Sequence, residues 1–218
     1  MRCVTRRIGD WTGAGTLGTN SVGGRWYGTA RYGFAYSLEG VWQNGHLGLL
    51  PQRAYAWYAG LARPVTVAGR KLNLSVNYTE ASGTKRGAAN STTYDQLSPA
   101  NHDQYGNQDL FGWRNIRQIK STETLNLTKS LALSVMYASQ WLDNPDDRLF
   151  NSRGDAISLG TVNTRAPHIG QELDSYVTWR TGPHCSARAL AGTSVVRFWK
   201  QPRHTPIQRT STCFNNTS

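Results

Sequence analysis

The chain has 218 residues, and its 24 Lys+Arg against 13 Asp+Glu give a formal net charge of +11. Only 17% of the residues are charged while 11% are aromatic, which excludes a disordered chain and a Leu/Glu/Lys-rich helical bundle. No window approaches the roughly 20 apolar residues that a membrane-spanning helix needs. The positive excess favours polyanionic partners such as nucleic acid, anionic lipid headgroups or an acidic polysaccharide.

The start of the chain is basic, but no apolar core follows it, so we expect that this sequence carries no secretory signal peptide. The three cysteines, Cys3, Cys185 and Cys213, lack metal-ligand spacing. We therefore predict neither a metal site nor a cofactor.

Period-two alternation of apolar and polar residues recurs along the chain and predicts antiparallel β-strands. The weaker alternation covers Gly24–Ala30 and Asn115–Leu127, and the stronger covers Tyr32–Trp42, Arg53–Arg63, Lys71–Glu80, Leu131–Trp141 and Ile169–Trp179. These segments give about seven strands before residue 182.

The connections between the predicted strands are unequal. Asn44-Gly45 predicts a turn, Pro64 is expected to end its strand, and Leu127–Leu131 predicts a tight hairpin. By contrast, Ser82–Gly112 and Leu142–His168 are long polar segments. Short turns alternating with long loops are typical of outer-membrane barrels.

Alternation alone fits either a soluble sandwich or a membrane barrel with its polar face inward. Aromatic residues near strand ends, namely Trp42, Tyr78, Trp141 and Trp179, suit the interfacial girdles of a barrel. The polar faces are rich in Ser, Asn, Gly and Ala, and the strands have the roughly 9–11 residues needed to cross a bilayer at a tilt. We therefore predict an all-β fold, an antiparallel up-and-down transmembrane β-barrel.

One long segment carries a family resemblance. Residues Tyr94–Arg117 read YDQLSPANHDQYGNQDLFGWRNIR and resemble the F-D-Q-L-F-P-T-x-H…G-x-x-D-L-F-G-x-x-N-I-R segment of the alginate-export family. Shorter matches are Gly24–Gly28, Ala54–Trp57, Leu127–Leu131, Arg148–Gly154 and Ile169–Asp174. The resemblance covers roughly residues 22–182.

The resemblance implies a large outer-membrane barrel of Gram-negative bacteria, with a basic lumen that passes an anionic polysaccharide or another small anionic solute. It implies that Arg25, Arg31, Arg114 and Arg117 face the lumen, where guanidinium groups pair with carboxylates. Lys85, Arg86 and His102 lie in a predicted loop that can fold toward the pore. The implied partners are outer-membrane lipid, the anionic solute and periplasmic export components, and not nucleic acid.

The chain is short for the full barrel of this family, so we expect about seven to eight strands of a larger barrel. We divide it into an uncertain segment 1–16, a barrel region 17–182 and an aberrant tail 183–218. If each codon from Gly192 onward is read from its third base, suitable synonymous codons encode an amino-acid sequence that resembles the family's G-H-F-x-x-x-F-L-x-x-T-T-P ending. A frameshift near Ala189–Gly192 is therefore predicted, and the coding DNA tests it.

Three alternatives remain open at this point. One is a soluble antiparallel β-sandwich or small barrel that binds carbohydrate or nucleic acid, although the aromatics mostly share a face with Leu and Val rather than with basic residues. Another is a complete eight-stranded barrel. An enzyme is disfavoured, because His102, Asp103 and Asp95 have no accompanying nucleophile or metal triad, and we predict no catalytic residues.

Overall fold

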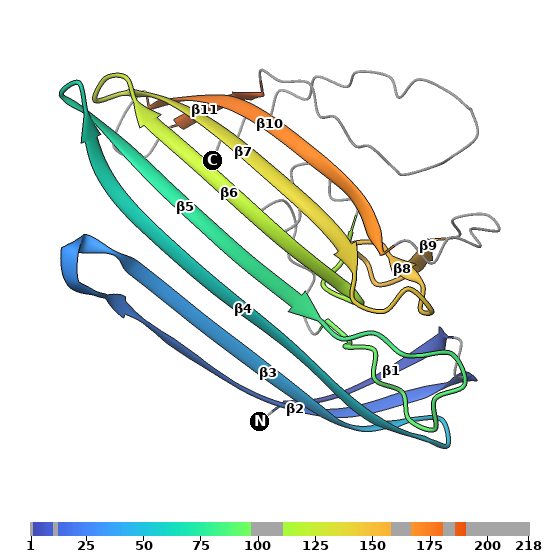
Figure 1. Ribbon diagram of the computed structural model, residues 1–218. Helices are drawn as coiled ribbons and strands as arrows, with labels where there is room; N and C mark the ends of the chain where they lie inside the picture. The colour runs from blue at the N-terminus through green and yellow to red at the C-terminus, as the bar shows by residue number, and fades with distance from the viewer. Residues whose placement is uncertain (1, 11–12, 97–110, 158–166, 181–185, 191–218) are drawn as a thin grey trace, which may run out of the picture.

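The computed structural model describes residues 2–10, 13–96, 111–157, 167–180 and 186–190. Their regular structure is β-strand, apart from one short 3-10 helix, η1 (Arg31–Gly33). Nine strands form the main sheet (Figure 1). They are β1 (Arg2–Asp10), β2 (Gly13–Thr29), β3 (Ala35–Leu47), β4 (Leu50–Val67), β5 (Arg70–Ala81), β6 (Ile116–Asn126), β7 (Leu131–Leu142), β10 (His168–Arg180) and β11 (Ser186–Leu190). No helix in this part of the chain is long and apolar enough to cross a membrane.

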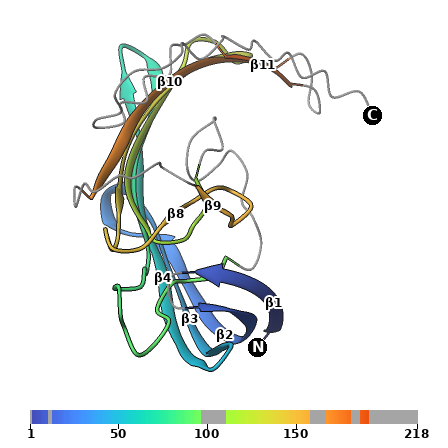
Figure 2. The same ribbon diagram turned by 90° about the vertical axis from the view of Figure 1, so that its right-hand side faces the viewer.

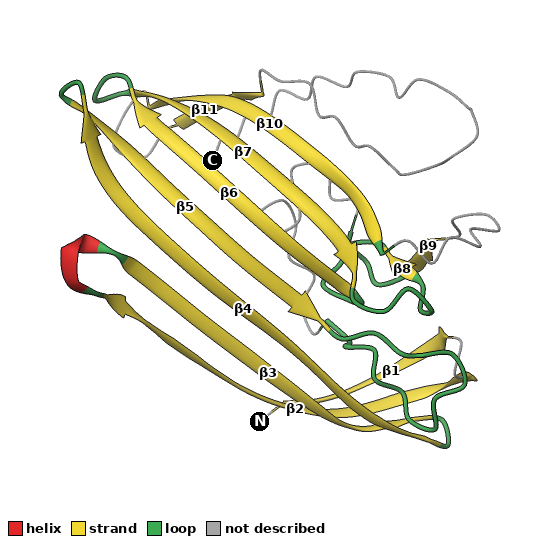
Figure 3. Ribbon diagram, viewed as in Figure 1, coloured by secondary structure: helices red, strands yellow, loops and turns green. Residues whose placement is uncertain are grey.

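Each strand of the main sheet pairs antiparallel with its neighbour in the chain. The one insertion is a two-stranded ribbon, β8 (Leu149–Phe150) with β9 (Ala156–Ile157), between β7 and β10. Figure 3 shows the nine strands as a single continuous layer. The predicted all-β, up-and-down antiparallel class is therefore confirmed. In the described residues β1 and β11 are the two edges, so the sheet is an open part of a barrel.

The two ends of the sheet differ in their connections. The turns at η1, at Ala68-Gly69 and at residues 127–130 are short and lie at one end. At the other end, long segments join β5 to β6 and β7 to β10 (Figure 1). We call these the short-turn end and the long-loop end.

The strand register divides the side chains between two faces. The inner face is concave in Figure 2 and carries buried polar side chains such as Gln43, which is 0% exposed. The outer face carries exposed large apolar side chains such as Trp26, which is 66% exposed. Other exposed outer-face residues are Val22, Leu38, Trp42, Trp57, Leu61, Leu74, Val76, Ile119, Tyr137, Leu173 and Trp179. The polar face is thus covered toward the long-loop end, whereas the apolar face is open along the strands.

Two predictions about strand ends are wrong. The chain does not turn at Asn44-Gly45, because β3 continues to Leu47 and reverses at Gly48, whose φ of 57° suits glycine. Gly45 instead allows close packing, since an added Cβ would clash with the carbonyl oxygen of Gly18. Pro64 does not end β4 either. Pairing with β3 stops at Ala62, so β4 has an open edge at Pro64, where a strand tolerates proline.

Candidate functional site

The inner face offers a row of hydrogen-bonding groups along the strands. Asn73, Ser75, Asn77 and Thr79 of β5 share this face. The hydroxyl of Tyr58 donates to Asn77 Oδ1 at 2.8 Å. Short uncharged polar side chains of this kind suit a surface along which water and polar solutes pass.

Charged side chains on the inner face are of both signs. By register the cations on the strands whose side chains are described are Arg25, Lys71, Lys120 and Arg180, and the carboxylates are Glu39, Glu172 and Asp174. Arg25 Nε donates to Ser37 Oγ at 3.2 Å. Both signs of charge therefore line this part of the inner face, with one more cation than carboxylate.

The long-loop end of the inner face is covered by three segments, residues 82–96, 111–115 and 143–157, which we call the inward loop cluster. Two glutamines hold it to the sheet. Gln43 Nε2 donates to the carbonyl oxygen of Asp95 at 2.7 Å, and the Asp95 amide donates back to Gln43 Oε1 at 2.9 Å. Gln52 Nε2 donates to the carbonyl oxygen of Thr93 at 2.6 Å. Both glutamines are fully buried, so these bonds are shielded from water.

Buried carboxylates hold the loops to one another. Asp147 Oδ2 accepts from the Thr84 amide at 2.9 Å and from the hydroxyl of Thr93. Asp143 Oδ2 accepts from the Gly83 amide at 3.0 Å. The segment after β5 is thereby joined to the segment after β7, and the two long loops form one unit.

Asn115 completes this polar connection at the entry to β6. It is fully buried with a φ of 48°, a conformation that asparagine tolerates better than most residues. Its Nδ2 donates to the carbonyl oxygens of Asn144 at 3.1 Å and Arg148 at 2.9 Å, and its Oδ1 accepts from the Asn144 amide at 2.8 Å.

An apolar cluster fills the space between the loops and the sheet. Loop side chains pack against small residues of β4 and β5, such as Ala54 and Ala81. The cluster consists of Ala54, Ala56, Ala81, Tyr94, Phe111, Trp113, Ile116, Leu149 and Ile169. Burial raises the pKa of Tyr94 to about 12, and the neighbouring Asp95 carboxylate adds to the shift. Burial also raises the pKa of Asp147, while its hydrogen bonds oppose that effect.

The structure separates the four arginines that the resemblance grouped in the lumen. Arg25 lies on the inner face. Arg31 lies in η1 at the short-turn end, with its guanidinium 4.9 Å from the ring centroid of Tyr32.

Arg114 is buried inside the inward loop cluster rather than facing a lumen. Its guanidinium carbon lies 4.2 Å from the Phe150 ring centroid, and Nη1 lies 3.6 Å from Asp95 Oδ1. Its side chain is only 3% exposed, so a solute does not reach it in this structure.

By register Arg117 lies on the outer face, whereas the resemblance implies a lumen position for it. It pairs with Asp143 at 2.6 Å and lies 4.0 Å from Glu80. Lys85 and Arg86 are exposed at the loop that follows β5, and His102 lies outside the described residues.

The sequence patterns did not identify the residues that hold the loops to the inner face of the sheet. Gln43 follows the predicted strand Tyr32–Trp42, and alternation marks it only as a polar residue on the face opposite Trp42. Asp95, Arg114 and Asn115 lay in the segment that carried the resemblance, and the structure gives them packing roles. In the described residues no group of three or more His, Cys, Asp or Glu side chains could hold a metal ion.

Comparison with known proteins agrees with this architecture. A search of curated proteins gives no match. The sequence model of the family described as Alginate export matches residues 5–196. The match extends beyond the predicted region 17–182 at both ends and covers most of the chain. The chain belongs to the alginate export family.

Proposed function

We propose that the sheet is part of an outer-membrane channel wall and that an anionic polysaccharide or another small anionic solute passes along its inner face. Membership of the alginate export family supports an export or porin role at the family level. Arg25, Lys71, Lys120 and Arg180 are the inner-face strand cations placed to attract uronate carboxylates. The carboxylates between them weaken each site, which lets a chain advance without being trapped.

One observation carries this proposal: the large apolar side chains are exposed on the outer face, while the buried polar side chains lie on the inner face. A soluble sandwich would bury its apolar face against a second sheet, and in the described residues no second sheet covers the face that carries Trp26 and Trp57. The outer face therefore suits lipid, and the inner face suits a wet path.

Substituted-cysteine labelling of the full chain in outer-membrane vesicles tests the assignment of faces. The native cysteines are first replaced by serine. Neighbouring positions on β5 then give a matched pair, because Ser75 faces inward and Val76 outward. We expect a charged, water-soluble thiol reagent to modify Ser75→Cys and to spare Val76→Cys. The opposite pattern would refute the assignment.

The solute is tested on the same variants. An oligouronate added during labelling should slow the modification of inner-face cysteines near Arg25, and a neutral oligosaccharide of equal length should not. Equal protection by both sugars would argue against an anionic solute.

A further inference from the structure

The outer face contains a hollow where two glycines lie side by side. Gly24 of β2 is the cross-strand partner of Gly40 of β3, which in turn is opposite Trp57 of β4. A Cβ added to either glycine would meet no atom within 4 Å. The hollow has a volume of about 470 Å³, within the range of ligand pockets.

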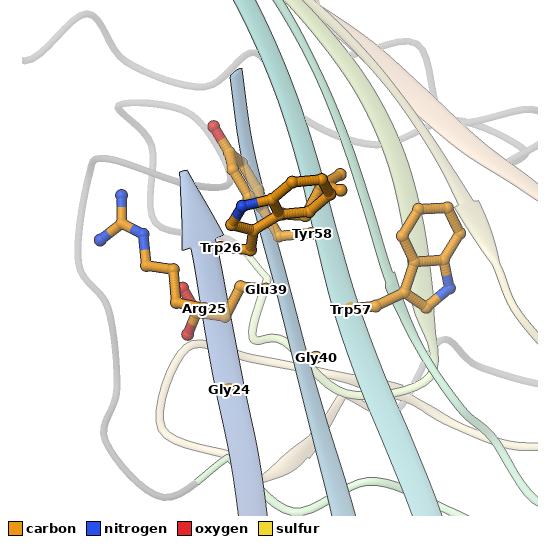
Figure 4. Close-up of a pocket in the computed structure, with 8 residues that line it drawn as sticks. Gly24, Arg25, Trp26, Glu39, Gly40, Trp57 and Tyr58 are labelled. Atoms are coloured by element: carbon orange, nitrogen blue, oxygen red, sulfur yellow. The ribbon is translucent and has the colours of Figure 1, made fainter. Parts of the chain in front are cut away.

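The walls of the hollow are large and apolar. Figure 4 shows Trp26 and Trp57 projecting from the sheet on either side of the glycines. Leu38 also lines the hollow, and by register Arg25, Glu39 and Tyr58 direct their side chains to the opposite face. The shape and chemistry fit one acyl chain lying along the strands.

The residues between the hollow and the long-loop end change from apolar to polar in order. Trp42 and Tyr55 come first, with their rings stacked at a centroid distance of 6.3 Å. Amphipathic rings of this kind sit at the level of lipid headgroups. Arg53 follows on the same face of β4, paired with Asn44. Asn44 is four positions after Gly40, which is a rise of about 13 Å along the strand. This distance matches the separation between the headgroup of a lipid and the middle of its acyl chain.

Arg53 is the cation available at this level. It is exposed, and its side chain forms no ion pair with any residue that the structure describes. The neighbouring charges are already engaged: Glu80 accepts hydrogen bonds from Tyr55 at 3.0 Å and Tyr78 at 2.7 Å, and Arg117 pairs with Asp143. A phosphate at this level would therefore meet a positive group.

We infer that this surface binds a lipid with an anionic phosphate headgroup, from the leaflet on the long-loop side, with its acyl chain in the Gly24/Gly40 hollow and its phosphate at Arg53. The inference rests on the proposed membrane orientation of the outer face. It adds a specific lipid site to a face that otherwise requires only a general apolar solvent.

Fluorescence quenching by brominated lipids tests the site on the full chain in detergent micelles. The signal of Trp57 is taken as the difference between the chain and its Trp57→Phe variant. Brominated phosphatidylglycerol should bind about fivefold more tightly than brominated phosphatidylcholine, the effect of one basic side chain near an anionic headgroup. Arg53→Gln should remove this preference. Arg63→Gln, which removes an outer-face cation near the short-turn end, should retain it.

The hollow is tested by Gly40→Leu, which fills open space and replaces a glycine in a strand, so the variant should fold at least as well. It should weaken quenching of Trp57 by both lipids, whereas Ser121→Leu places a leucine elsewhere on the outer face and should not. Unchanged quenching in Gly40→Leu, or a lipid preference that persists in Arg53→Gln, would overturn the lipid site alone. If neither lipid quenches Trp57 in any variant, the outer face does not meet lipid, and the proposed function fails with the inference.

Discussion

Replacing Gln43 with methionine should detach the inward loop cluster from β3 while leaving the sheet intact. The side chain is fully buried and makes three hydrogen bonds, two with the backbone of Asp95 and one with Ser21 Oγ at 3.2 Å. Methionine has a similar volume but cannot donate or accept these bonds. The buried amide and carbonyl of Asp95 are then left without partners, at about 1–3 kcal/mol each. We expect the free energy of local opening to fall by roughly 2–6 kcal/mol.

Amide hydrogen exchange measures this loss directly, because the Asp95 N–H is itself one of the broken bonds. A loss of about 2 kcal/mol should accelerate its exchange by about 25-fold. The Tyr94 amide, which donates to the Ser82 carbonyl oxygen at 2.9 Å, should be accelerated less, because that bond lies within the loop. Gln118→Met is the matched control, since Gln118 is buried on the same face but its Nε2 has no hydrogen-bond partner among the residues that the structure describes. Unchanged protection of Asp95 in Gln43→Met would refute the anchoring role.

Three further predictions concern charged side chains. Since burial raises the pKa of Asp147, the folded loops bind its proton more tightly than the unfolded chain does, and the stability of the loops should decline as the pH rises from about 4 through the folded pKa. Asp147→Asn should remove this pH dependence from the exchange of the Thr84 amide. A loop stability that rises over the same pH range would contradict the prediction. Arg114→Met removes the buried guanidinium beside the Asp95 carboxylate and should lower the free energy of unfolding in urea by about 3–5 kcal/mol. Asp95→Asn in the same chain should restore part of this free energy. A loss of solute binding at unchanged stability would instead indicate a lumen role for Arg114. Arg117→Gln should lower the free energy of unfolding by at most about 1 kcal/mol, because the Arg117 side chain is half exposed. It should leave the reversal potential in a salt gradient unchanged, whereas Arg25→Gln should shift the reversal potential in the direction of greater cation selectivity. Equal shifts in the two variants would place both arginines on the solute path.

The strand faces were predictable from sequence because they depend only on alternation. Leu72, Leu74, Val76 and Tyr78 share one face of β5, as their spacing requires. The position of a reversal was less predictable. Two glycine-containing sites, Asn44-Gly45 and Gly48, compete to end β3, and only the pairing with β2 and β4 decides between them.

The candidate site was harder to predict because it depends on contacts between distant segments. Arg114 and Arg117 are three residues apart, so on one regular strand they cannot share a face. The structure separates them further, because the left-handed backbone of Asn115 precedes β6 and directs Arg114 into the loops. No local pattern reveals that Gln43 meets Asp95, 52 positions later in the chain. A family resemblance shows that such a segment matters without showing which contacts it makes.

The alternation on β2 and β3 links the two proposed surfaces to one register. Gly24 and Gly40 face outward, while the adjacent Arg25 and Glu39 face inward and are cross-strand partners. A slip of one residue would exchange the faces of every side chain on a strand. It would move Arg25 to the lipid side, at about 2–4 kcal/mol near the bilayer midplane, and Trp26 to the wet side. The same two-residue steps therefore form the hollow on the outer face and the charged pair on the inner face, and a change of register would lose both.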